Sequence, residues 1–281
     1  MHYLLLSGLA FALSLILTPL VRKLAFRLGC VDIPRPPRNL HSRPTAKLGG
    51  LAVFLSFGIS VTFYLVYGDI NYAVIPFKFF LAMLAGGALL MVEGYLDDRY
   101  NLAPKILWLF PAFAALITVS AGVGVGITEI GNPFGGPISL KFLILGIPAS
   151  AVFVWLWMMG MMFTTKFLDG IDGLVSGIGT IASLTLFVLS LLPHINQPMT
   201  ATISIILAAS LAGYLVYAFH PASIFLGDGG SLLVGFLLGV LSIILGGKIA
   251  TALLVMGIPI LDVAWVLLQR VWQRRSVFRG D

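Results

Sequence analysis

The chain has 281 residues, of which 59% are hydrophobic and only 10% are charged. Its mean hydropathy of +1.04 exceeds what the core of a soluble domain requires and indicates an integral membrane protein. The net charge of +6 would suit nucleic acid in a soluble chain, but in a membrane protein it fits basic loops beside anionic lipid, so we expect no nucleic-acid partner. The single cysteine, Cys30, excludes a disulfide framework within the chain.

Apolar segments of about 20 residues, each long enough to cross a bilayer, alternate with charged residues, proline and glycine. The first segment has no basic residue before it and no clear small-residue cleavage site, so we expect a retained helix rather than a signal peptide. The pattern predicts an all-α polytopic transmembrane helical bundle. Its nine expected spans cover residues 3–21, 49–67, 77–96, 104–121, 142–162, 174–192, 200–219, 230–246 and 249–268.

The positions of Lys and Arg predict how this bundle is oriented. Nine spans place fourteen of these residues on one side of the membrane and three, Lys78, Lys141 and Lys248, on the other. The positive-inside rule makes the first side cytoplasmic. The same assignment puts all of the Asp-containing motifs on the cytoplasmic face, so we expect a multi-pass protein of the plasma (inner) membrane with a cytoplasmic active site.

Five aspartates, nearly half of the 11 acidic residues, lie in three short motifs where apolar segments break. Asp97 and Asp98 end a span, where they oppose the helix dipole; this favours a metal ligand or a base over a solvated terminus. Asp169 and Asp172 occur in Asp-Gly-Ile-Asp-Gly, whose spacing keeps both on one side of a helical turn, with capping of the next span as the alternative or an added role. Asp228 opens a span whose N–H groups suit phosphate, again with capping as the alternative.

Other polar signals are weaker. The loop over 35–47 carries four Lys and Arg residues and His41, which suits anionic lipid or a diphosphate, although part of this charge can serve topology alone. Glu93 and Asp262 fall within spans, so we expect each to face the bundle interior or a wet cavity. Hard oxygen ligands without a Cys/His cluster favour Mg²⁺ or Mn²⁺ over zinc.

The order of the motifs carries a family resemblance. Pro-Thr and Gly-Gly near 44–50, Gly-x-x-Asp-Asp at 94–98, Asp-Gly-Ile-Asp-Gly-Leu at 169–174 and Phe-Leu-Gly-Asp-Gly-Gly-Ser at 225–231 together resemble the polyprenyl-phosphate N-acetylhexosamine-1-phosphate transferases, of glycosyltransferase family 4 type. The resemblance runs from about residue 20 to 281. Arg-Pro-Thr and Asp-Asp-Arg-Tyr are more similar to the undecaprenyl-phosphate N-acetylglucosamine-1-phosphate transferases that start O-antigen or teichoic acid linkage synthesis. Phospho-N-acetylmuramoyl-pentapeptide transferase of peptidoglycan synthesis stays an alternative.

This resemblance implies Mg²⁺-dependent transfer of a sugar 1-phosphate from a UDP-sugar to a polyprenyl phosphate, such as undecaprenyl phosphate, with release of UMP. The reaction would be the first membrane step of cell-envelope glycan synthesis, and related enzymes suggest a homodimer. The resemblance implies catalytic roles for Asp97, Asp98 and Asp228. We assign Asp228, Asp98 and Asp172 as the metal ligands. Contacts with the nucleotide sugar or a phosphate are assigned to Asp169, Asp172, Lys166, Lys47, Arg43 and Thr45.

Two departures from the family pattern leave other interpretations open. Lys166 and Phe163 stand where relatives have Asn, and Lys166 is expected to pair with Asp169, bind a phosphate or occupy a metal site. Relatives continue past a stretch like 275–281 into a His-rich cytoplasmic loop and at least one further span, so we expect a single transferase domain over 1–281 that lacks them. A truncated or non-catalytic membrane relative is therefore an alternative.

Two further classes fit the motifs less well. A transporter would place its acids near the middle of the membrane and use broken helices, whereas these acids lie at span ends. An Asp-rich prenyltransferase would need Asp-Asp-x-x-Asp, and this chain has Asn101 at the last position.

Overall fold

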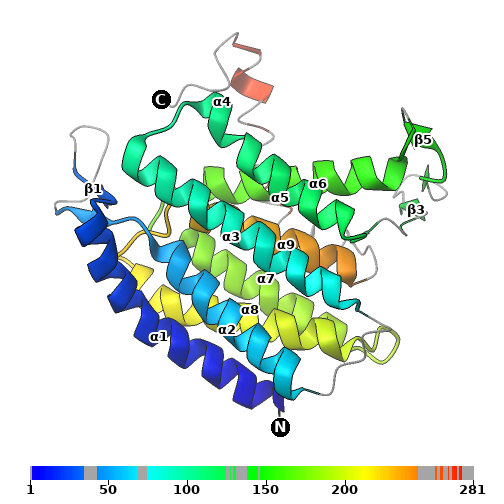
Figure 1. Ribbon diagram of the computed structural model, residues 1–281, viewed down its shortest axis with the longest axis horizontal. Helices are drawn as coiled ribbons and strands as arrows, with labels where there is room; N and C mark the ends of the chain where they lie inside the picture. Colours follow the sequence, from blue (N-terminus) through cyan, green and yellow to red (C-terminus); the bar gives the residue numbers. More distant parts are fainter. Residues whose placement is uncertain are drawn as a thin grey trace.

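The computed structural model describes residues 2–34, 43–68, 75–124, 127, 129–130, 138–144, 146–245 and single positions or short stretches between 257 and 273. Within this part of the chain, helices run roughly along one common direction and pack side by side (Figure 1). They are α1 (His2–Leu28), α2 (Gly49–Tyr67), α3 (Phe77–Tyr100), α4 (Pro104–Leu107), α5 (Leu109–Ser120), α6 (Ala149–Leu168), α7 (Leu174–Ser190), α8 (Pro198–Ala218) and α9 (Asp228–Ile244).

Short antiparallel hairpins lie at both ends of this bundle. At the end where α2 begins, β1 (Val31–Asp32) pairs with β2 (Thr45–Ala46). Near the opposite end lie the pairs β3 (Glu129–Ile130) with β4 (Ile138–Ser139) and β5 (Leu143–Ile144) with β6 (Ile147–Pro148) (Figure 1). The chain is therefore mostly, but not purely, helical.

The hairpin of β5 and β6 corrects one predicted span. The sequence predicts a helix over 142–162, but α6 begins only at Ala149. Gly146 has a φ of 82°, a conformation that suits a tight turn and not a helix. Pro148 directly precedes the helix and restricts the residue before it to extended conformations. Apolar composition alone does not distinguish such a hairpin from the first turns of a helix.

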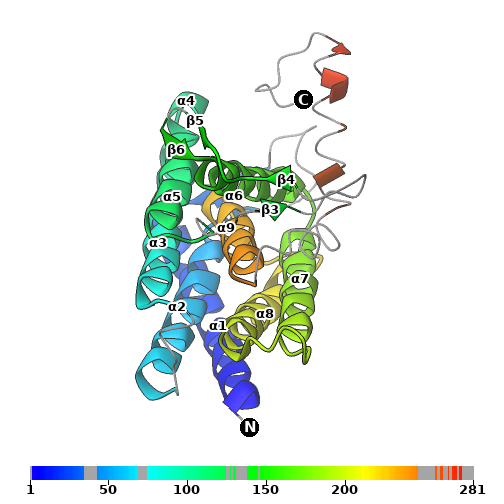
Figure 2. The ribbon, with the colours of Figure 1, turned by 90° about the vertical axis from the view of Figure 1, so that its right-hand side faces the viewer.

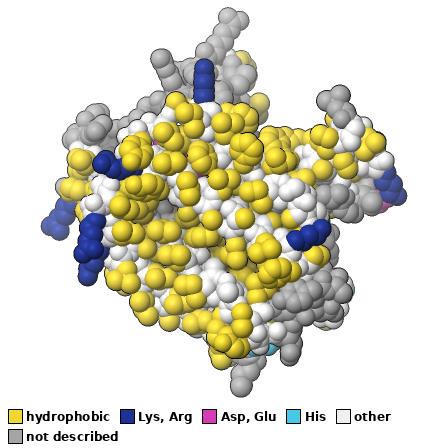
Figure 3. Space-filling model, viewed as in Figure 1, with side chains coloured by type: hydrophobic (Ala, Val, Ile, Leu, Met, Phe, Trp, Pro, Cys, Tyr) yellow, Lys and Arg dark blue, Asp and Glu magenta, His cyan; other side chains and the backbone are white. Residues whose placement is uncertain are grey.

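Five of the described helices, α1, α2, α3, α6 and α8, are long and apolar enough to cross a membrane. The segment Pro104–Ser120 and helices α7 and α9 are shorter but also apolar. The face seen in Figure 3 is mostly hydrophobic, with Lys and Arg side chains mainly toward its margins. These features confirm a mostly helical protein with several candidate membrane spans. The count of nine spans stays a prediction, because most of 249–268, with Asp262, lies outside the described residues.

Helix α9 forms the centre of the core. Its residues from Gly229 to Ile243 are all buried, and it packs against α6, α3, α2 and α7. Figure 2 shows it between α2 and α3 on one side and α7 on the other. A Cβ atom at Gly235 would collide with Met161, and one at Gly239 would lie 2.9 Å from Sδ of Met158. This Gly-x-x-x-Gly pair therefore packs α9 against α6 within one chain.

Glycines also let two helices reach the beginning of α9. A Cβ atom at Gly94 of α3 would lie 2.6 Å from the Cα atom of Gly229, and one at Gly50 of α2 would collide with Gly230. Only residues without a side chain allow backbones to approach so closely. The crossings bring the end of α3 and the beginning of α2 to the beginning of α9.

Candidate active site

Four helix ends meet at one end of the bundle and bring the predicted acids together. They are the beginnings of α2 and α9 and the ends of α3 and α6. Electrostatic contacts join Asp97 and Asp98 of α3 to Asp228 of α9, and Asp169, directly after α6, also senses the charge of Asp228. Motifs far apart in the sequence therefore form one acidic cluster, as their common placement at span ends predicts.

Lys166 lies among these acids. Its Nζ atom is 3.2 Å from Oδ1 of Asp228 and 3.6 Å from Oε1 of Glu93. The predicted ion pair with Asp169 is therefore not the one that forms: Lys166 lies on α6 itself, whereas Asp169 is the capping residue after it. Glu93 is fully buried, as its place within a span predicts. Sequence reasoning missed its pairing with Lys166, since the two residues lie on different helices.

Asp97 lies next to Asp228. Their carboxyl groups are in hydrogen-bonding contact, and Oδ1 of Asp97 also accepts a hydrogen bond from the backbone N–H of Leu102 at 3.2 Å. That second contact closes the end of α3, where Asn101 has a left-handed φ of 49°. Two carboxylates this close repel each other unless a proton or a cation lies between them.

Asp98 points toward the other side of α3. Its side chain is only 2% exposed, and its Oδ1 atom lies 3.8 Å from Nζ of Lys47. Lys47 is also 3.8 Å from Oδ1 of Asp32 on β1, a partner that the sequence motifs do not indicate. The predicted basic residue Lys47 is thus held at the cluster by two acids.

Asp228 is the first residue of α9, as its motif predicts. The hydroxyl of Ser231 donates to the Asp228 carbonyl at 2.9 Å, and the Ser231 N–H donates to the Gly227 carbonyl at 3.0 Å. These bonds satisfy two carbonyl groups of the first turn, and Gly227, the residue before α9, makes no side-chain capping bond. The Asp228 side chain is left to interact with Asp97 and Lys166.

Asp169 and Asp172 do not lie on one side of a helical turn, and neither caps α7. Residues 169–173 form a turn, and the residue before α7 is Gly173, which makes no side-chain capping bond. Oδ2 of Asp172 lies 2.9 Å from Nδ1 of His220 and accepts the backbone N–H of Ala222 at 3.1 Å. The two acids therefore have different partners, which helical spacing does not predict: Asp172 contacts His220 and Ala222, and Asp169 senses the charge of Asp228.

The surroundings of Asp169 disfavour the ionised form of its carboxyl. Surrounding protein atoms desolvate it and, together with the charge of Asp228, raise its pKa to about 7, against the lowering influence of Lys47. The residue nevertheless keeps exposed surface, so water still reaches this side of the cluster and weakens the shift.

The remaining predicted residues lie on the approach to α2. Thr45 is buried, and its hydroxyl donates to the carbonyl of Arg43 at 3.1 Å, so this hydroxyl stabilises the turn before β2. Arg43 is exposed. Their contacts with a phosphate stay a prediction, and His41 lies outside the described residues.

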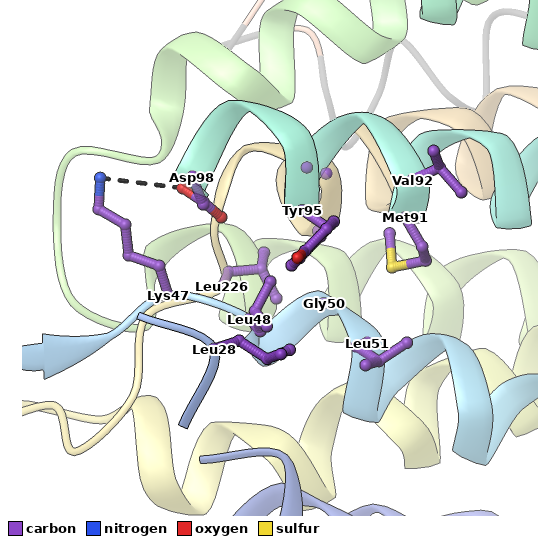
Figure 4. A pocket seen from close by; sticks show the side chains of 13 residues that line it. Leu28, Lys47, Leu48, Gly50, Leu51, Met91, Val92, Tyr95, Asp98 and Leu226 are labelled. Carbon is purple, nitrogen blue, oxygen red and sulfur yellow. Dashed lines mark ion pairs between the residues drawn. The ribbon is translucent and has the colours of Figure 1, made fainter. Parts of the chain in front are cut away.

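An apolar groove leads to the cluster. It has a volume of about 370 Å³ and runs between the end of α1, the beginning of α2 and the last turns of α3. Figure 4 shows Lys47 paired with Asp98 at one end and Leu51 and Met91 toward the other. The groove therefore combines a charged end with hydrocarbon walls.

The donor set fits a hard cation in part. Among the described residues, no group of three or more His, Cys, Asp or Glu side chains is arranged to hold a metal ion. The ligand set of Asp98, Asp172 and Asp228 stays a prediction; in this structure the Asp172 carboxylate contacts His220 and Ala222. The adjoining carboxylates of Asp97 and Asp228 are the oxygen donors that suit Mg²⁺.

Comparison with known proteins identifies the family of this chain. The model of the family described as Glycosyl transferase family 4 matches residues 80–246, which include all five aspartates of the three motifs. The chain belongs to glycosyl transferase family 4. The family expectation from the sequence motifs is thus confirmed, and this member is a sugar-1-phosphate transferase.

Several named proteins are similar to this chain. A probable undecaprenyl-phosphate N-acetylglucosaminyl 1-phosphate transferase of Bacillus subtilis is 30% identical over 95% of this chain and 71% of its own length. A decaprenyl-phosphate N-acetylglucosaminephosphotransferase of Mycobacterium tuberculosis is 32% identical over 93% of this chain and 69% of its own. A phospho-N-acetylmuramoyl-pentapeptide-transferase of Staphylococcus carnosus is 27% identical over 87% of this chain and 77% of its own.

Proposed function

We propose that this transferase moves N-acetylhexosamine 1-phosphate from a UDP-sugar, such as UDP-N-acetylglucosamine, to a polyprenyl phosphate and releases UMP, with Mg²⁺ as cofactor. The observation that carries the proposal is an acidic cluster with interleaved lysines at the charged end of an apolar groove. Such a site can accept one phosphorylated substrate from water and another from the bilayer. The positive-inside count supports a cytoplasmic location for it.

The groove suits the lipid acceptor. Its walls include Leu28, Leu51 and Met91, which match a hydrocarbon chain, and Lys47 at its charged end matches a phosphate head. Asp98 pairs with Lys47 at this end of the groove. An incoming phosphate would compete with Asp98 for the ammonium, which places the acceptor oxygen beside the acidic cluster.

The reaction requires an oxygen of the lipid phosphate to attack the β-phosphorus of the UDP-sugar. A new P–O–P bond forms, the bond to the α-phosphate breaks, and UMP leaves. When bound, Mg²⁺ would neutralise the charge that the diphosphate accumulates. Asp97 and Asp228 would hold the cation, Lys166 would lie beside the phosphates, and Asp98 would orient Lys47. Asp169 and Asp172 would face the nucleotide from the turn after α6.

The test is lipid-dependent UMP release by purified protein in detergent. The mixture contains polyprenyl phosphate, Mg²⁺ and a panel of UDP-N-acetylhexosamines, with UDP-N-acetylmuramoyl-pentapeptide included because of the Staphylococcus carnosus relative. We expect UMP that requires lipid and disappears with EDTA and in Asp228→Asn. The matched control is Glu129→Gln, which removes one charge near the opposite end of the bundle. UMP release that persists in Asp228→Asn or without lipid would contradict the proposal.

A further inference from the structure

Glu93 lies on the closed side of this site. Its side chain is 0% exposed, and neither carboxylate oxygen has a hydrogen-bond partner. An ionised carboxylate in such a place is strongly unfavourable unless a cation compensates it. Glu93 also lies one helical turn before Asp97, on the same face of α3. Its carboxylate is therefore aimed into the cluster and depends on a cation there.

That cation is Lys166. Its ammonium lies between Glu93 on the closed side, at 3.6 Å, and Asp228 on the more open side, at 3.2 Å. The Asp228 side chain is 35% exposed and the Lys166 side chain 22% exposed. The lysine thus has two acidic partners, of which only Asp228 is also open to an incoming ligand.

A divalent cation on Asp228 would repel this ammonium. Lys166 cannot keep its contact with Asp228 at full strength while that carboxylate also binds a divalent ion, because the two cations would lie side by side. Glu93 offers the ammonium a second anchor, since its oxygens have no competing hydrogen bonds. The lysine can therefore shift toward Glu93 without leaving the site.

We propose that Lys166 is a resident cation that shares Asp228 with the divalent ion, and that Glu93 is the positioning residue that retains Lys166 when the ion binds. This inference rests on the proposed function only in taking Asp228 as a ligand of the divalent ion. Lys166 then remains beside the metal, where its charge faces the transferred diphosphate. Metal affinity is thereby set by competition within the protein.

The experiment measures Mn²⁺ binding by electron paramagnetic resonance on the full chain in detergent, without substrate. We expect Lys166→Met to bind Mn²⁺ at least about tenfold more tightly than wild type, because a like charge beside the ligand is removed. Glu93→Gln should bind Mn²⁺ several-fold more weakly, because Lys166 then has only Asp228 as a partner and competes more strongly with the ion. The size of this effect is that of a like charge near the ligand. Asp228→Asn should lose the site, and Lys141→Met, which changes an exposed lysine between β4 and β5, should match wild type.

The double variant Glu93→Gln/Lys166→Met keeps the inference testable if Lys166→Met fails to fold, because it removes both charges together. It should bind Mn²⁺ as tightly as Lys166→Met. Unchanged or weaker binding in the variants that lack Lys166 overturns the inference, as does wild-type affinity in Glu93→Gln or absence of Mn²⁺ binding from every protein. UMP release by wild type is assayed separately, so a failed reaction with intact Mn²⁺ competition refutes only the proposed function.

Discussion

The charged groups in two corners of the same site differ in how deeply they are buried. In the inner corner, Glu93 and Lys166 lie next to Asp228, and Glu93 has no access to water. In the outer corner, Asp172 contacts His220, whose side chain is 82% exposed, and the backbone N–H of Ala222. A buried charge depends on its partner, whereas an exposed charge is screened and can also be solvated. Similar ion-pair distances therefore predict unequal consequences.

Catalysis should show the largest difference between the corners. Asp228→Asn is expected to lower the rate of UMP release about 100- to 1000-fold, the usual effect of removing one electrostatic contact at the reacting groups. Asp172→Asn should lower it about tenfold or less, as for the loss of one ordinary hydrogen bond. Initial rates at saturating lipid measure both. Equal losses would mean that Asp172 moves into the inner corner during the reaction.

The second-largest difference between the two corners should be in the stability of variants that lose one charged partner. Lys166→Met leaves Glu93 buried without its cation, so we expect the free energy of unfolding to fall by about 3 kcal/mol. The double variant Glu93→Gln/Lys166→Met should lie within about 1 kcal/mol of wild type, because no uncompensated charge remains. Thermal unfolding in detergent provides the comparison. Additive losses in the double variant would show that the two residues do not act as a pair.

The outer pair should contribute less. His220→Ala removes an exposed partner of Asp172 but leaves the hydrogen bond from Ala222. We expect a loss of about 0.5–1 kcal/mol in the free energy of unfolding, typical of an exposed ion pair or hydrogen bond. His194→Ala, in the loop between α7 and α8, is the matched control. A loss as large as that of Lys166→Met would refute the contrast between the corners.

The smallest expected effect is pH-dependent. The pKa of Asp169 rises from 3.8 to about 7 in the folded chain, first through desolvation and then through the charge of Asp228. Between pH 3.8 and about 7, the carboxyl is ionised in the unfolded chain but still protonated in the folded chain. Raising the pH through this range therefore favours the unfolded state, and the stability that the protonated carboxyl contributes is lost by about pH 7. The stability of Asp169→Asn relative to wild type should therefore increase from pH 5 to pH 8. Thermal unfolding of both proteins at these two pH values measures the difference. A constant difference would show that water keeps the carboxyl near its ordinary pKa.

Helix positions follow closely from apolar patterning, but their edges depend on local backbone chemistry. Helix α2 spans Gly49–Tyr67 as predicted from 49–67, and α9 begins at Asp228, near the predicted start at 230. Helix α6 begins at Ala149 and not at 142, because apolar residues also form the hairpin before it. The pattern of apolar residues predicts which segments are buried, but it does not predict where a glycine allows the chain to turn.

The sequence by itself determined the family, the membrane-crossing helices and the acids at their ends, because composition, motif order and charge are local properties. Only the tertiary structure decided which charges meet: Lys166 contacts Glu93 and Asp228 instead of Asp169, and Asp172 turns toward His220. Close crossings at Gly94 and Gly235 bring α3 and α6 against α9, which carries Asp228. Ion pairs depend on distances of a few ångströms between separate helices, and spacing along one chain does not specify such distances.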